Sequence, residues 1–251
     1  MTAAGTMTAA LVLAGRRNEQ DPLLERHPGL PSKALLPVAG EPMVRRVLAA
    51  LGERPVWISG LSAEEAGADI RSAPPAPGPA GAVLAAVEAG APLPLLVTTA
   101  DHALLDAEMV AEFEDKARAS GADLCVGLAE RSVIEARFPQ TRRTYLRFAD
   151  ARVSGCNLFY VGNEKGLEGV RFWQRAERDR KKPWRLARRI GPSVLLRYVA
   201  GRLTLDGLFA HASHRLNASI RPVLMSRAEA AVDVDKPSDL DLVEAVLGGR
   251  A

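Results

Sequence analysis

The sequence is short of cysteine, of long apolar runs and of net charge, and each shortage excludes a class of protein. The two cysteines, Cys125 and Cys156, are too few for a disulfide scaffold or a four-cysteine zinc site. No apolar run reaches the roughly 18 residues of a membrane-spanning helix, and the stretch 9–14 is too short for a secretory signal. These features together predict a cytoplasmic location.

The charge balance and composition are those of a globular protein. Lys and Arg number 33 against 30 Asp and Glu, and the resulting net charge of +3 is too small to indicate a nucleic-acid partner. The chain has 251 residues, of which 47% are hydrophobic and 25% charged. A chain of this kind buries a full core without metal or disulfide support.

Short apolar runs alternate with helical patterns along the chain. Strands are expected at 10–14, 56–59, 95–99, 124–129, 144–148, 153–161 and 222–225, and helices at 42–51, 80–89, 106–120 and 238–247. This alternation predicts an α/β fold with a mostly parallel, mixed sheet and helices on both of its faces. Such sheets bind ligands at the carboxyl ends of their strands.

We expect one domain over residues 1–251, with its core at about 9–162 and 216–249 and a helical, basic insertion at about 163–215. Residues 171–202 contain eleven basic and two acidic residues, a net of +9. Three interpretations remain open: a solvated helical face, a cap whose arginines meet an anionic acceptor, and peripheral contact with an anionic membrane surface.

The first strand leads into residues that suit a phosphate ligand. Gly15 follows the strand directly, and a glycine there lets the backbone approach a ligand closely. Arg16 and Arg17 add positive charge at the same point. Lys33 stands alone in the apolar stretch PSKALLPVAGEPM at 31–43, where the alternative is an ordinary solvated lysine before a turn.

Four blocks in order resemble the signature of nucleotidyltransferases with a GT-A-like fold, which include the MobA-like NTP transferases of molybdenum-cofactor synthesis and the sugar-1-phosphate and methylerythritol-phosphate enzymes. The blocks are LAG at 13–15 followed by 31–43, PGPAG at 77–81, LLVTTAD at 95–101 and AVDVDKPSDL at 231–240. The resemblance implies a Rossmann-like fold and Mg²⁺-dependent transfer of CMP or GMP from an NTP to a phosphorylated acceptor, with release of pyrophosphate. The acceptor is left open between a sugar phosphate, an alcohol phosphate and molybdopterin.

The resemblance also implies a role for each matching residue. Its catalytic residues are Lys33, Asp101 and Asp233, and its metal ligands are Asp101, Asp233 and Asp235. Its nucleotide-binding residues are Leu13, Ala14, Gly15, Arg16, Arg17, Lys33, Gly78, Pro79, Ala80 and Gly81. The resemblance places Asn157 on the acceptor side, and the interpretation of the basic insertion as a cap places Arg185 there as well.

Simpler interpretations stand beside these roles. Asp101 is also suited to cap a loop before the helix near 106, and Asp235 to cap the helix after Pro237. His211 and His214 have no carboxylate or cysteine nearby to complete a metal site. The first loop holds a single glycine, so the alternative function is a nucleotide-binding or regulatory protein that keeps the fold without catalysis.

Overall fold

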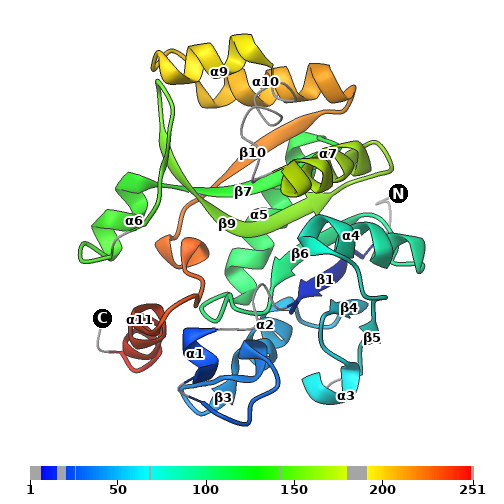
Figure 1. Ribbon diagram of the computed structural model, residues 1–251, viewed down its shortest axis with the longest axis vertical. Helices are drawn as coiled ribbons and strands as arrows, with labels where there is room; N and C mark the ends of the chain where they lie inside the picture. The colour runs from blue at the N-terminus through cyan, green and yellow to red at the C-terminus, as the bar shows by residue number, and fades with distance from the viewer. Residues whose placement is uncertain are drawn as a thin grey trace, which may run out of the picture.

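The computed structural model describes residues 7–15, 21–25, 27–67, 69–141, 143–179 and 191–249. Its centre is an eight-stranded sheet in the order β10-β7-β9-β6-β1-β4-β5, with β8 paired to β9 (Figure 1). The strands of this sheet are β1 (Ala9–Leu13), β4 (Val56–Ser59), β5 (Arg71–Ser72), β6 (Leu95–Thr99), β7 (Leu124–Glu130), β8 (Leu146–Arg147), β9 (Arg152–Val161) and β10 (Ile220–Met225). The helices are α1 (Pro22–Glu25), α2 (Met43–Leu51), α3 (Ala63–Ala66), α4 (Gly78–Glu88), α5 (Ala107–Ser120), α6 (Arg131–Arg137), α7 (Gly166–Asp179), α9 (Pro192–Val199), α10 (Leu205–Leu216) and α11 (Pro237–Leu247).

The sheet is mixed and mostly parallel, as the sequence predicts. β1 runs parallel to β4 and β6, and β10 runs parallel to β7. β9 is antiparallel to both β6 and β7 and joins the two parallel halves. A two-stranded hairpin of β2 (Pro37–Val38) and β3 (Glu41–Pro42) lies outside this sheet.

Helices cover both faces of the sheet, and the alternation of side chains along the strands builds a core on each. In β1, Ala10 and Val12 face a core shared with α2 and α5, whereas Ala9 and Leu11 face a core shared with α4, α7 and α10. All four residues are fully buried. Burying a side chain such as that of Leu11 contributes about 1.5–3 kcal/mol to stability. Because successive side chains of a strand point to opposite faces, the sequence of β1 determines which helices pack against each face.

The part of the expected basic insertion that is described is helical. α7 and α10 pack on the sheet through Leu167, Val170 and Phe209, and α9 lies outside α10 at one end of the molecule (Figure 1). None of the described helices combines the length and apolar character needed to cross a bilayer. The strand expected at 144–148 is wrong in extent: β8 is only Leu146–Arg147, because Phe148 N–H already bonds to Ala151 O in the turn into β9.

Candidate active site

Three distant segments meet at the carboxyl ends of the central strands. β6 ends at Thr99 and leads directly to Asp101. The irregular segment before α11 is tied to the same loop, because Val234 N–H donates to Asp101 O at 3.0 Å. Lys33 reaches this junction from the N-terminal part of the chain, with its Nζ 3.3 Å from Val234 O. Residues separated by about 200 positions therefore share one site.

Lys33 is held in place by its local structure. It opens a short 3₁₀ helix, Lys33–Leu35, in which the Ser32 hydroxyl accepts from Ala34 N–H. Its Nζ lies 2.6 Å from Asp101 Oδ2 and 2.8 Å from Asp235 Oδ1. The interpretation of Lys33 as a solvated surface lysine is therefore wrong. Burial would lower the pKa of Lys33, but the charges of Asp101 and Asp235 outweigh it, so the pKa is raised and the ammonium group stays charged.

Asp101 faces the site and does not cap a helix. The cap of α5 is Asp106, whose Oδ1 accepts from Met109 N–H at 2.9 Å. The side chain of Asp101 is 11% exposed. Its Oδ1 is buried and has no hydrogen-bond partner among the described residues. One carboxylate oxygen thus pairs with Lys33, while the other keeps its capacity to bind a ligand.

Asp233 forms a second cluster beside the first. Its Oδ1 lies 3.1 Å from Arg143 Nη1, and its Oδ2 accepts from Asn157 Nδ2 at 3.4 Å. Asn157 has a φ of 50° and lies where the register between β7 and β9 shifts. Such a bulge turns a side chain out of the strand pattern, and asparagine tolerates this left-handed backbone better than most residues. The fold thereby places Asn157 beside Asp233.

The carboxylates of the two clusters act on one another. Burial raises the pKa of Asp233, and the negative charges of Asp235 and Asp101 raise it further. Arg143 opposes this rise but does not cancel it. Asp235 does not cap α11, since Asp239 Oδ2 accepts the N–H groups of Asp235 and Lys236 instead. Among the described residues, the site therefore brings three carboxylates together beside the cations of Lys33 and Arg143.

A cavity of about 640 Å³ opens beside Lys33 and Asp101. Seven residues expected from the sequence line it: Leu13, Ala14, Gly15, Lys33, Gly78, Pro79 and Asp101. Ala80 and Gly81 are instead buried in the first turn of α4. The adjoining carboxylate clusters contain Asp233, Asp235 and Asn157. Three expected arginines fall outside the described residues: Arg16, Arg17 and Arg185. The cavity size suits a small-molecule ligand.

The floor of this cavity depends on a close approach of two glycines. Gly60 has a φ of 87°, and a Cβ atom there would lie 2.5 Å from the Cα and N atoms of Gly15. At Gly15 itself a Cβ would meet none of the described residues within 4 Å. Gly60 was not anticipated from the sequence, because only the fold brings the end of β4 against the end of β1.

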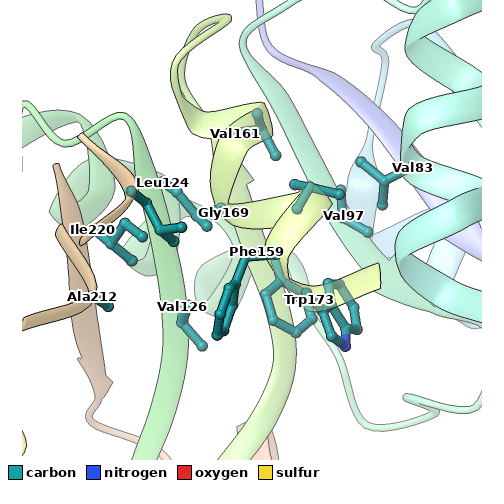
Figure 2. A pocket seen from close by; sticks show the side chains of 13 residues that line it. Val83, Val97, Leu124, Val126, Phe159, Val161, Gly169, Trp173, Ala212 and Ile220 are labelled. Carbon is teal, nitrogen blue, oxygen red and sulfur yellow. The ribbon is translucent and has the colours of Figure 1, made fainter. Parts of the chain in front are cut away.

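A second cavity of about 310 Å³ lies between the sheet and α7 and α10. Figure 2 shows that hydrocarbon side chains such as Val97, Val161 and Phe159 line it, with the Trp173 ring beside Phe159. These two rings are stacked with centroids 4.8 Å apart. Trp173 also lines the first cavity. Apart from its indole, the lining residues described offer no polar side chain, so the groups capable of chemistry belong to the first cavity.

Sequence reasoning missed Arg143, His102 and the residues of α7 that line the first cavity. Arg143 lies in a loop without a motif, and Gln174, Glu177 and Arg178 lie outside the four blocks. His102 is only 1% exposed, and burial lowers its pKa to about 4, so its ring is neutral at neutral pH. Its position directly after Asp101 was the available signal.

The donor set suits magnesium when a ligand supplies the remaining oxygens. Among the described residues, no group of three His, Cys, Asp or Glu side chains is arranged to hold a metal ion alone. Mg²⁺, however, is commonly bound by one or two carboxylates together with water and phosphate oxygens. The buried, unpartnered Oδ1 of Asp101 and the raised pKa of Asp233 fit such a site.

Comparisons with known proteins agree with this geometry. The model of the MobA-like NTP transferase domain family matches residues 10–138. A hypothetical transferase from Thermus thermophilus is 32% identical with a TM-score of 0.81, over 94% of this chain and 100% of that chain. The 2-C-methyl-D-erythritol 4-phosphate cytidylyltransferase from Thermus thermophilus is 16% identical with a TM-score of 0.52, over 96% and 98% of the two chains. A CMP:2-keto-3-deoxy-manno-octonic acid synthetase complexed with CTP is 16% identical with a TM-score of 0.54, over 97% and 100%. No curated protein matches.

Proposed function

The chain belongs to the MobA-like NTP transferase domain family and is a nucleotidyltransferase, and we propose that it transfers CMP or GMP from the triphosphate to a phosphorylated acceptor. An oxygen of the acceptor phosphate attacks the α-phosphorus of the NTP. The bond from that phosphorus to the bridging oxygen of the β-phosphate breaks, and pyrophosphate leaves with the electron pair. The acceptor phosphate is already anionic at neutral pH, so the step needs no general base.

Lys33 supplies the positive charge that this reaction requires. Negative charge grows on the α-phosphoryl oxygens and on the leaving pyrophosphate, and preorganised cations stabilise such charge in a low-dielectric site. The Lys33 ammonium lies at the rim of the larger cavity and is anchored by Asp101 and Asp235. Its raised pKa keeps it charged throughout the neutral range.

Asp101 and Asp233 are the residues that would hold Mg²⁺, with Asp235 beside them. When bound, the cation would neutralise phosphate charge and offset the mutual repulsion of the carboxylates. Asp101 contributes its unpartnered Oδ1. Asp233 is oriented by Arg143 and Asn157.

The two sides of the site divide between the substrates. The cavity lined by Leu13, Gly15 and Gly78 suits the nucleotide, because glycines let a ligand approach the backbone closely. Arg143 and Asn157 contact Asp233 and suit the acceptor phosphate, since guanidinium and amide groups donate to phosphate oxygens. Two buried free cysteines are consistent with a reducing cytoplasm as the place of the reaction.

The observation that carries this proposal is the bridging position of Lys33, a lining residue of the cavity, between Asp101 and Asp235. The test is pyrophosphate release with each of four NTPs and a panel of phosphorylated sugars and alcohols, with Asp101→Asn as the inactive control. We expect acceptor-dependent release with CTP or GTP. Release with ATP or UTP alone would overturn the choice of base, and no release with any pair would overturn the reaction.

A further inference from the structure

Large apolar side chains are exposed on one helix at the end of the molecule. Leu195, Leu196 and Val199 are 41%, 70% and 76% exposed, and all three lie on α9 within five positions. The opposite side of α9 is buried at Val194. α9 lies outside α10, away from the sheet (Figure 1). Apolar side chains that are exposed side by side on one helix form a candidate interaction surface.

The surroundings of this ridge are cationic. Arg197 and Arg202 are exposed on α9 and in the turn after it. The β8–β9 hairpin packs against the same helix, since the rings of Phe148 and Tyr198 lie 6.0 Å apart. That hairpin adds the exposed Arg147 and Arg152. The acidic residues described on the two elements and at the start of α10 are Asp150 and Asp206.

The combination of an apolar ridge with surrounding arginines matches an anionic lipid surface. We propose that α9 seats this protein on such a surface, with Leu195, Leu196 and Val199 entering the interface and the arginines meeting lipid phosphates. A second copy of the chain is a poorer occupant: a stable interface buries roughly 800 Å² per partner, more than three side chains provide, and like charges would face each other.

The test is sedimentation with vesicles made of equal parts phosphatidylcholine and phosphatidylglycerol, compared with vesicles of phosphatidylcholine alone. The full chain should bind the anionic vesicles at low salt and lose binding at high salt, because screening weakens the attraction. Leu196→Gln with Val199→Gln should lower partitioning about tenfold or more. Arg197→Gln with Arg202→Gln should lower it about fivefold or more and reduce the salt dependence.

Leu247→Gln is the matched control, because Leu247 is 37% exposed on α11, away from α9 (Figure 1). It should bind vesicles as the unaltered chain does, and circular dichroism should show that all variants are folded. The proposal is overturned if the unaltered chain ignores anionic vesicles at low salt, or if the α9 double variant binds them equally well. It is also overturned if light scattering shows a dimer that the α9 variant dissociates while vesicle binding is absent.

Discussion

Replacing Asp233 by Asn should abolish catalysis. In the absence of ligands, the same variant should be more stable to heat than the unaltered protein. The carboxyl of Asp233 has a raised pKa because of burial and because of the charges of Asp235 and Asp101. That direction already includes the favourable pairing with Arg143, so the ionised group costs the folded state free energy on balance. Each unit of pKa elevation corresponds to about 1.4 kcal/mol. One kcal/mol moves the Tm of a chain of 150–250 residues by about 2–4 °C, so we expect the variant to have the higher Tm.

The raised pKa of Asp233 also predicts how the stability difference between the two proteins changes with pH. Between the unfolded and the raised folded pKa, the native state binds more protons than the unfolded state, and stability therefore falls as pH rises. The variant lacks this dependence, so its advantage should be largest at neutral pH and shrink on acidification. The assay is thermal unfolding with a chelator and without nucleotide, and Asp241→Asn on the exposed side of α11 controls for net charge. A lower Tm for Asp233→Asn at neutral pH would refute the reasoning, because the Arg143 pair would then outweigh the repulsion.

Three further substitutions probe the site. Asp101→Asn should lower pyrophosphate release by a factor of about 10² or more, and near-normal turnover at limiting Mg²⁺ would argue against a metal role. Lys33→Ala should lower kcat/KM by about 10² or more while circular dichroism stays unchanged; a lost fold would mean that Lys33 is structural. Gly60→Ala should weaken NTP binding in calorimetry, because its Cβ would collide with the backbone of Gly15, and unaltered affinity would remove Gly15 from the nucleotide site.

The sequence predicted the main strands and helices because their periodicity is local. β6 was expected at 95–99 and is Leu95–Thr99, and α5 was expected at 106–120 and is Ala107–Ser120 with Asp106 as its cap. The short elements were missed for the opposite reason. β5 has only two residues, Arg71–Ser72, and forms solely because β4 offers it a parallel edge.

Site residues that stand in a local sequence motif were predicted, whereas those that depend on tertiary contacts were missed. Lys33 and Asp101 stand in recognisable sequence blocks, although the direct contact between them could not be predicted. Arg143 has no sequence signal, since its pairing with Asp233 spans 90 positions and is made only by the tertiary fold. Motifs thus report groups that face a ligand, while the partners that orient those groups are set by the tertiary fold.

The electrostatics of Asp233 explain why this site departs from the rules that hold in the rest of the core. Elsewhere in the described chain, buried charges are matched: Glu114, for example, is 5% exposed and pairs with Arg54 at 2.6 Å. Around Asp233, the described residues bring three carboxylates together beside the cations of Lys33 and Arg143, and burial and carboxylate repulsion still raise the pKa of Asp233. Selection for stability alone would remove this repulsion. Its presence at the ends of the central strands is understandable if a bound cation and phosphate groups complete the balance, which is the condition under which a nucleotidyltransferase works.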